Sequence, residues 1–326
     1  MTLAELLRAA PPVRVAGPVD VLIKGLSHDS REVAAGDLFF AMPGAKTDGN
    51  RHSRQALDNG AIAVISELEP PPPPAIVRGT WIQVTDAAET MSRVAAEFFA
   101  HPSAAMTVVG VTGTNGKTTT TYLLESIVAA AGGTPAVAGT IENRLGGKRL
   151  EKAINTTPIS LSLTRLLARF REGKATHALL EVSSHALTLK RVEAVDFDAA
   201  IFLNLTRDHL DFHKTVDAYF DAKARLFDLL ARADNKKKPK VAALNFDDQR
   251  AHLLVKMAIG CDVVRFGQTD KAADLRGKII SADLNGTKFE INWRGKKFES
   301  SLRLPGTHNV ENALAAAAAM LGLGTT

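Results

Sequence analysis

The sequence predicts an α/β protein with two domains: a small N-terminal α/β domain, then a central domain with a mostly parallel sheet and an added antiparallel meander. From Met106 onward, strands that are apolar on both faces alternate with helical segments, a pattern typical of a parallel sheet covered by helices on both sides. A glycine-rich turn joins the first of these strands to its helix. A chain of 326 residues is also long enough to form two hydrophobic cores.

Residues 1–103 are expected to form the N-terminal domain. In chain order we expect a strand at 36–42, a helix at 53–60, a strand at 61–66, a proline-rich surface loop at 69–75 and a helix at 90–103. Proline has no backbone N–H to donate, so the last of these helices stops at Pro102. Because a new apolar strand starts at Met106, we place the domain boundary between residues 103 and 104.

Residues 104–326 are expected to form the central domain. The expected strands lie at 106–113, 135–139, 177–184, 198–205 and 240–245, and the expected helices at 119–132, 161–173, 216–233 and 308–326. Asn-Gly and Arg-Gly turns separate alternating apolar and polar runs over 278–306. Such turns join antiparallel strands, so this segment is predicted to add the meander to the sheet.

The composition narrows the class of protein. A single cysteine, Cys261, excludes an internal disulfide and suits a reducing compartment. The N-terminus has no apolar run long enough for a signal peptide or a membrane span. We therefore expect a cytoplasmic monomer with no membrane partner.

The formal charge of +5 does not indicate a nucleic-acid partner. Part of it lies in the lysine-rich stretch 235–240, which is more typical of a solvated loop than of a nucleic-acid patch. Two Trp and two Tyr are too few aromatic residues for a base-stacking surface. An anionic small-molecule substrate accounts for the basic balance at least as well.

The stretch VVGVTGTNGKTTT, residues 108–120, is typical of a phosphate-binding loop between a strand and a helix. It departs from the spacing G-x-x-x-x-G-K-[ST], because Val111 stands where the first glycine belongs and Gly110 is one place early. Backbone amides at the helix N-terminus would face the phosphates, Lys117 would neutralise them, and a threonine hydroxyl would bind Mg²⁺. We predict ATP binding by Gly113, Thr114, Asn115, Gly116, Lys117, Thr118 and Thr119. The alternative is a glycine-rich turn with an incidental lysine.

This spacing, with Thr114 and Asn115 inside the loop, resembles that of the Mur ligases of peptidoglycan synthesis and of their relative folylpolyglutamate synthase. In ALLEVSSHAL, residues 178–187, Glu181 stands at the carboxyl end of a strand, where ligands bind in open α/β sheets. The resemblance implies that Thr118 and Glu181 are Mg²⁺ ligands and that Ser184 helps to hold a sugar-nucleotide substrate. A surface acid at a strand end is the alternative for Glu181.

The stretch NLTRDHLDFH, residues 204–213, places Asp208, His209, Asp211 and His213 in a short loop. The resemblance implies that His209 contacts a second Mg²⁺. Oxygen-dominated sites with one imidazole suit Mg²⁺ or Mn²⁺ rather than structural zinc. Without the resemblance, this loop would serve equally well to cap a helix.

The stretch YFDAKARLFD, residues 219–228, contributes Lys223. The resemblance implies that this lysine is carbamylated and then helps to position the magnesium ions. Carbamylation needs a neutral amine, so the pKa of the lysine must fall through burial or nearby positive charge. Spacing alone favours an exposed helical lysine paired with Asp221 or Asp228.

Two further stretches match residues that grip the acyl substrate in the family: Asn155, Thr156 and Thr157 in NTTP, and Arg191 in LKRV. Leu189 stands where family members often have glutamine, so one substrate hydrogen bond of the family has no counterpart here.

The late stretch LPGTHNVENALAA carries Asn309 and Asn312, one helical turn apart. They match family contacts near ATP. Their alternative is an N-cap followed by a polar helical position.

The first domain resembles the UDP-binding domain of the tripeptide-forming Mur ligases, a domain that folylpolyglutamate synthase does not have. Asp29, Ser30 and Arg31 match the uridine-binding stretch, and Asp48-Gly49 falls where the pyrophosphate approaches. The spacing from D-S-R to V-x-x-G-D-L-F makes this match more specific than D-S-R alone.

The resemblance implies a ligase that uses ATP and Mg²⁺ to phosphorylate the D-Glu carboxylate of UDP-MurNAc-L-Ala-D-Glu. The amine of a diamino acid, meso-diaminopimelate or L-lysine, then attacks the acyl phosphate, with Lys117, His209 and Lys223 as catalytic residues. Because family members continue into a third α/β domain, we expect a fragment that binds both ligands but has little activity. Another Mur or folylpolyglutamate-type ligase, or a non-catalytic nucleotide-sugar-binding module, remains the alternative.

Overall fold

A computed structural model of the chain describes residues 1–44, 48–71, 79–232 and 239–325. The proline-rich loop predicted at 69–75 and the lysine-rich stretch at 235–240 each lie partly outside these residues. The chain divides into two compact units. The N-terminal unit comprises Met1–Pro102, Ile159–Leu166 and Leu189–Ala194, and the central unit comprises Ser103–Pro158, Leu167–Thr188 and Val195–Thr326. Sequence reasoning did not assign the two short later segments to the N-terminal unit.

The N-terminal unit is built on a five-stranded sheet of order β1-β5-β4-β3-β2. Its strands are β1 (Arg14–Ala16), β2 (Gly25–Ser27), β3 (Asp37–Phe40), β4 (Ala63–Ser66) and β5 (Thr80–Gln83). Its helices are α1 (Leu3–Leu7), η1 (Gly49–His52), α2 (Ser53–Asp58) and α3 (Ala87–Phe98). Strands β2 to β5 are parallel, and β1 is antiparallel to β5.

Alternation along β3 explains why this sheet is covered on both faces. Leu38 and Phe40 lie in one buried cluster with side chains of α1 and α3, whereas Phe39 lies in another with Ala56 of α2. Successive side chains of a strand point to opposite faces, so an all-apolar strand needs a helix on each side.

The central unit is built on an 11-stranded sheet of order β16-β15-β14-β13-β12-β11-β6-β10-β7-β8-β9. Its strands are β6 (Thr107–Thr112), β7 (Pro135–Ala138), β8 (Glu142–Leu145), β9 (Lys148–Lys152), β10 (His177–Glu181), β11 (Ala199–Phe202), β12 (Val241–Asn245), β13 (Asp262–Gly267), β14 (Leu275–Asp283), β15 (Gly286–Trp293) and β16 (Lys296–Leu302). Its helices are α4 (Lys117–Ala130), α6 (Ser184–Thr188), α7 (Leu210–His213), α8 (Val216–Arg232), α9 (Ala251–Leu254) and α10 (His308–Gly322), preceded by η2 (Pro102–Ala105). Helix α5 (Ser160–Glu172) begins in the N-terminal unit's segment and ends in the central unit's.

The strands from β14 to β7 in this order are parallel, and antiparallel hairpins extend the sheet at both ends. The predicted fold class, with its meander, is therefore confirmed. Strand β13 and the β8–β9 hairpin were not predicted. Among the described residues, no helix is long and apolar enough to cross a membrane.

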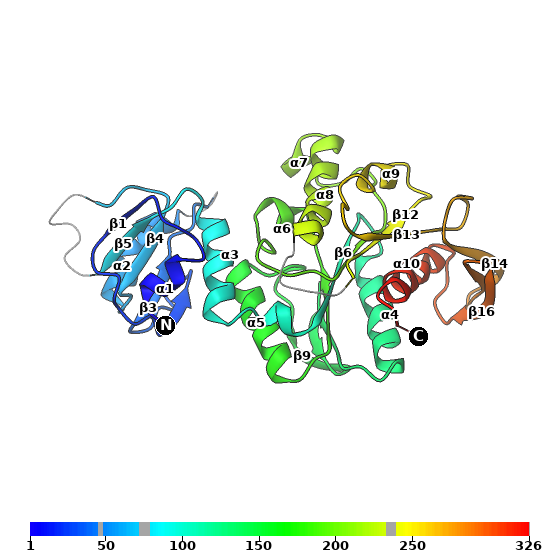
Figure 1. The fold of residues 1–326 in the computed structure, drawn as a ribbon, viewed down its shortest axis with the longest axis horizontal. Coiled ribbons are helices and arrows are strands. Elements are labelled where there is room, and N and C mark those ends of the chain that lie inside the picture. The colour runs from blue at the N-terminus through cyan, green and yellow to red at the C-terminus, as the bar shows by residue number, and fades with distance from the viewer. Residues whose placement is uncertain (45–47, 72–78, 233–238, 326) are drawn as a thin grey trace. The chain divides into compact units, whose positions relative to one another are not determined.

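Strand β6 shows how the central sheet is covered. Val109 and Val111 lie in a buried cluster with side chains of α4 and α10, two helices that lie beside each other in Figure 1. Gly110 faces the opposite side, where a Cβ atom would lie 2.7 Å from Phe197 Cε1 and 3.1 Å from Leu226 Cδ1 of α8. The glycine that is misplaced for a phosphate loop therefore serves packing, because it lets α8 approach the sheet.

Candidate functional site

The turn between β6 and α4 depends on two glycines with positive φ. Gly113 has φ 155°, and a Cβ atom there would lie 2.8 Å from the Cβ of Leu203. Gly116, the N-cap of α4, has φ 90°, and a Cβ atom would lie 2.2 Å from Asn312 Oδ1. No other residue type fits both the backbone and the space at these positions.

Two lysine side chains converge on one carbonyl oxygen of this turn. Lys117 Nζ donates to the Gly113 oxygen at 2.8 Å and to the Thr114 oxygen at 2.9 Å. Lys223 Nζ, from α8, donates to the same Gly113 oxygen at 2.9 Å and lies 4.3 Å from the centre of the Tyr219 ring. Two amine nitrogens therefore lie close together at the N-terminus of a helix, where a second positive charge is unfavourable.

This crowding has a clear effect on protonation. Burial, reinforced by the positive charge of Lys117, lowers the pKa of Lys223 from 10.5 to about 6. Burial also lowers the pKa of Lys117, while the carboxylates of Glu181 and Asp208 partly oppose the change. The side chain of Lys223 is 1% exposed, so the alternative of an exposed helical lysine is excluded.

Glu181, at the end of β10, is a buried carboxylate at the centre of a cluster of threonine side chains. Its two carboxylate oxygens each accept a 2.9 Å hydrogen bond from the Thr118 hydroxyl. They also accept from the backbone N–H and the hydroxyl of Thr140, again at 2.9 Å. The Thr140 hydroxyl lies 3.1 Å from that of Thr156. A Cβ atom at Gly139 would lie 2.2 Å from Glu181 Oε1, so only glycine admits the carboxylate.

The NTTP stretch is tied to the same strand end. The Thr157 hydroxyl donates to the Glu181 backbone oxygen at 2.8 Å and accepts from the Ser183 N–H at 3.1 Å. Asn155 is exposed, whereas Thr157 is buried. Thr156 and Thr157 therefore lie beside the Thr118–Glu181 pair.

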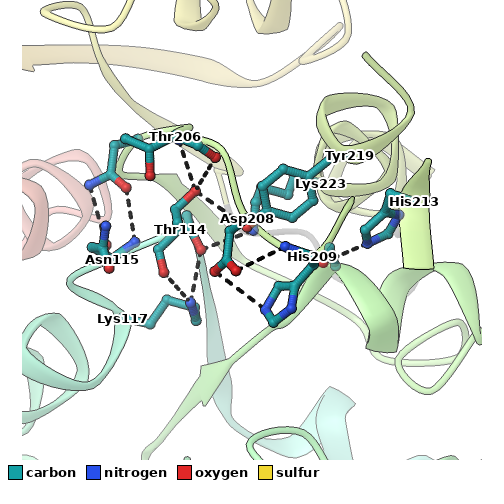
Figure 2. Close-up of polar contacts among 12 residues, drawn as sticks. Thr114, Asn115, Lys117, Thr206, Asp208, His209, His213, Tyr219 and Lys223 are labelled. Carbon is teal, nitrogen blue, oxygen red and sulfur yellow. Dashed lines mark hydrogen bonds and ion pairs between the residues drawn. The ribbon is translucent and has the colours of Figure 1, made fainter. Parts of the chain in front are cut away.

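The chain after β11 holds the glycine-rich turn from the other side. Asn204 Oδ1 accepts from the Asn115 N–H at 2.9 Å, and the Asn204 backbone oxygen accepts from the Thr114 N–H at 2.9 Å. The Thr114 hydroxyl accepts from the Thr206 N–H at 3.0 Å and lies 3.3 Å from the Tyr219 hydroxyl. Figure 2 shows these contacts around Thr114.

Asp208 lies between the turn and His209 in Figure 2. Its Oδ1 accepts from the His209 N–H at 2.9 Å, and its Oδ2 lies 3.5 Å from His209 Nε2. The ring of His185 stacks edge-on against that of His209, with centroids 4.9 Å apart. His213 Nε2 lies 2.9 Å from the buried Ser184 hydroxyl, and burial, with the neighbouring histidines, lowers the pKa of His213. Ser184 is therefore already engaged by a histidine.

Both asparagines of α10 are buried beside the turn. Asn312 Nδ2 donates to Asn309 Oδ1 at 3.2 Å, and Thr120 Oγ1 lies 3.5 Å from Asn312 Oδ1. Asn309 Nδ2 donates to the Pro305 oxygen at 2.8 Å. Asn312 lies against the start of α4, close to Gly116, and Asn309 is linked to the turn through Asn312.

The N-terminal unit holds four of the predicted substrate residues, of which Ser30, Arg31 and Asp48 lie in its first segment. The Ser30 hydroxyl donates to Gln55 Oε1 at 2.9 Å. Arg31 Nε donates to Asp29 Oδ1 at 2.9 Å, which holds the largely exposed guanidinium in place.

Asp48 accepts from the Asn50 N–H at 3.0 Å and so caps η1. Arg191 lies in the short segment Leu189–Ala194 of the same unit. Burial lowers the pKa of Arg191.

The predicted metal ligands, Thr118, Glu181, His209 and Lys223, include only two side chains of the types His, Cys, Asp and Glu. Among the described residues, no group of three or more His, Cys, Asp or Glu side chains could hold a metal ion. Thr118 and Glu181 do present a hydroxyl and a buried carboxylate side by side. Hard oxygen ligands in that number suit Mg²⁺, which keeps several waters and shares its other positions with phosphates.

Sequence reasoning gave no role to Thr140, Asn204 or Tyr219. Thr140 and Asn204 each stand two residues beyond a parallel strand, β7 and β11. The sheet order β11-β6-β10-β7 brings the carboxyl ends of these strands together with the glycine-rich turn and Glu181. The position of a polar residue just after a parallel strand is therefore the signal that could have identified Thr140 and Asn204. Tyr219, in α8, has no such signal.

Comparisons with known proteins agree with this arrangement. The family pattern described as "Mur ligase middle domain" matches residues 111–320, and the pattern described as "Mur ligase family, catalytic domain" matches residues 22–99. A protein of Solibacter usitatus named UDP-N-acetylmuramoyl-L-alanyl-D-glutamate–2,6-diaminopimelate ligase is 42% identical over 320 residues, which is 98% of this chain and 63% of that protein. A protein of Geobacter metallireducens with the same name is 41% identical over 325 residues, covering 99% of this chain and 62% of that protein.

A solved structure with the same protein name superposes with a TM-score of 0.82 at 31% identity, covering 99% of this chain and 64% of that one. The chain thus spans about 63% of the length of the curated relative from Solibacter usitatus.

Proposed function

Because the chain belongs to the Mur ligase family, we propose that it carries the ATP site and the UDP-substrate site of a ligase that adds diaminopimelate to UDP-MurNAc-L-Ala-D-Glu. The observation that carries the proposal is the convergence of Lys117 and Lys223 on the Gly113 oxygen, beside the Thr118–Glu181 pair. The names of the similar proteins supply the substrate and favour diaminopimelate over L-lysine.

In the proposed reaction, a carboxylate oxygen of the D-Glu residue attacks the γ-phosphorus of ATP, and the bond to the β-phosphate oxygen breaks. The amine of diaminopimelate then attacks the acyl carbon, phosphate leaves, and the nitrogen loses a proton. Such a phosphoryl transfer depends mostly on alignment and on neutralising charge. Lys117 and the N–H groups at the start of α4 are suited to neutralise the phosphates.

Thr118, Glu181, His209 and a carbamylated Lys223 are the residues that we propose hold Mg²⁺. When bound, the ion would neutralise negative charge on the phosphates. Lys223 fits carbamylation because it is buried and its amine is neutral near neutral pH. A neutral amine is the form that reacts with CO₂, and the product adds oxygen ligands.

We propose that the region 1–103 binds the UDP end of the substrate through Ser30, Arg31 and Asp48. Asn155, Thr156, Thr157, Ser184 and Arg191 would hold the peptidyl end, and Asn309 and Asn312 would lie near the nucleotide. We propose that the protein is a monomer and acts in the cytoplasm, where UDP-linked precursors and ATP are available.

Calorimetric titration tests the substrate assignment. We expect UDP-MurNAc-L-Ala-D-Glu to bind more tightly than UDP-MurNAc-L-Ala, because only the former carries the carboxylate to be activated. ATP should bind independently, and Lys117→Ala should abolish that binding. Equal affinity for the two UDP compounds would refute the proposed step, and preference for a folate would favour the folylpolyglutamate-type alternative. A further experiment adds a separately expressed third domain of the family to the chain and measures ATP hydrolysis. If both ligands bind but ATP is still not hydrolysed, the non-catalytic module would be favoured.

A further inference from the structure

Lys190 adopts a backbone conformation that its residue type disfavours. Its φ is 52°, in the left-handed region, where a side chain crowds the backbone and glycine is preferred. Strong side-chain contacts can offset this cost and fix the residue in place. The contacts around Lys190 therefore indicate what the conformation serves.

Those contacts come from one helix. Lys190 Nζ lies 2.7 Å from Asp86 Oδ2 and 2.6 Å from Glu89 Oε2. Asp86 is the N-cap of α3 and accepts from the Glu89 N–H at 2.8 Å, so both carboxylates stand on a fixed helix end. Burial alone would lower the pKa of Lys190, but the hydrogen bonds and charges of the two carboxylates raise it. The ammonium is therefore kept charged between two acids.

A second contact fixes the other end of the same short segment. The Ala194 N–H donates to the hydroxyl of Ser92 at 3.0 Å, and Ser92 is a buried residue of α3. Val192, between the two attachment points, is fully buried. Segment Leu189–Ala194 is thus held on α3 at both ends within the N-terminal unit.

Arg191 lies directly beside the strained residue. We propose that Lys190 is a positioning residue: its double ion pair to Asp86 and Glu89 holds the left-handed turn that presents Arg191 to the anionic substrate. This inference rests on the proposed function for its ligand, but the clamp itself belongs to the free protein. An ammonium between two carboxylates serves as an anchor, and the left-handed φ sets the direction of the next residue.

Hydrogen exchange of the free protein tests the clamp. Lys190→Met keeps the length of the side chain and removes the charge, so the amides of 191–194 should exchange about tenfold faster than in wild type. Lys174→Met is the matched control, because Lys174 also has a left-handed φ, of 59°, and is exposed, with no ion pair to a described residue. Unchanged exchange at 191–194 in Lys190→Met would overturn the clamp.

Binding of UDP-MurNAc-L-Ala-D-Glu tests its purpose. Lys190→Met should weaken this binding by about tenfold, the combined effect of losing two partly exposed ion pairs. ATP affinity should stay at the wild-type value, and Lys190→Arg should recover affinity to within about threefold because it restores the charge. In an Arg191→Ala background, Lys190→Met should have no further effect on the UDP ligand.

The double variant separates positioning from a general structural effect. Additive losses in Lys190→Met/Arg191→Ala, or equal losses for the UDP ligand and ATP, would overturn the positioning role. If wild-type protein does not bind the UDP compound at all, the proposed function fails, and the exchange of 191–194 alone decides the clamp.

Discussion

Replacing Lys223 with methionine should stabilise the folded central unit, and by an amount that depends on pH. In the unfolded chain this amine keeps its proton up to the ordinary pKa of 10.5, whereas in the folded protein its pKa is about 6. Between these values the unfolded state binds more protons, so the free energy of unfolding of the wild type rises with pH. Methionine fills a similar volume and has no proton to lose.

The size of the effect follows from the pKa shift. A pH of about 7.5 is three units below the ordinary lysine pKa of 10.5. Removing the proton of Lys223 on folding at this pH therefore costs roughly 4 kcal/mol, at about 1.4 kcal/mol per pH unit. At about pH 9 the same arithmetic leaves roughly 2 kcal/mol. The advantage of Lys223→Met should therefore shrink by about 2 kcal/mol across this interval, whatever constant contribution the change in packing adds.

Urea unfolding at several pH values measures this difference. The chain has two tryptophans, Trp81 in the N-terminal unit and Trp293 in the central unit. In a Trp81→Phe background, fluorescence follows the central unit alone. Buffers should be free of CO₂, and added bicarbonate should change the stability of the protein that retains Lys223 but not that of the Lys223→Met variant. Parallel stability curves for the two proteins would refute the buried neutral amine.

Three further outcomes are expected. Lys117→Ala should remove measurable ATP binding and leave affinity for UDP-MurNAc-L-Ala-D-Glu nearly unchanged, while Arg31→Ala should do the reverse; calorimetry with both ligands checks the pair, and a joint loss would contradict separate sites. Gly116→Ala should destabilise the central unit by about 2 kcal/mol or more in urea unfolding, because its Cβ would lie 2.2 Å from Asn312 Oδ1 at φ 90°. Thr112→Val should raise the free energy of unfolding by about 1 kcal/mol, because the buried Thr112 hydroxyl has no hydrogen-bond partner in the described structure; a loss of stability would reveal a partner.

The phosphate-type turn could be predicted from the sequence because its chemistry depends on consecutive residues. Gly113, Gly116, Lys117 and Thr118 are close in the chain, and a strand before and a helix after them fix their geometry. The partner of Thr118 is Glu181, whose position at a strand end was also visible. That the two side chains touch depends on β10 lying next to β6, which no local pattern specifies.

The burial of Lys223 could have been predicted from helical periodicity. Tyr219, Leu226, Phe227 and Leu230 are buried residues of α8 at spacings of three, four and seven from Lys223, so all share one face of the helix. A lysine in the middle of an apolar stripe indicates a buried amine. The nearness of Lys117 to Lys223 could not be predicted in this way, because the two lysines come together only at the Gly113 oxygen, to which both donate.

The units themselves were the least predictable feature. A single domain boundary at residues 103/104 cannot describe a unit to which two later segments also belong, Ile159–Leu166 and Leu189–Ala194. The first returns because its apolar side chains complete a distant core: Leu161 is fully buried in the cluster built around Leu38 and Phe40. The second is held on α3 by the polar contacts of Lys190 and Ala194. Sequence reasoning on one segment at a time does not detect such a contribution.

The position of Asn312 against the start of α4 also has a consequence for synthesis of the protein. Thr120 and Asn312 are 192 positions apart in the chain, so the turn at Gly116 leaves the ribosome long before the helix that packs on it. Contacts between such distant residues form late in folding. Until α10 is made, α4 can pack on strands β6, β7 and β10 but lacks its contacts with α10, and the turn lacks Asn312 beside Gly116. We expect a growing chain to be unable to bind nucleotide until nearly all of the central unit has been made.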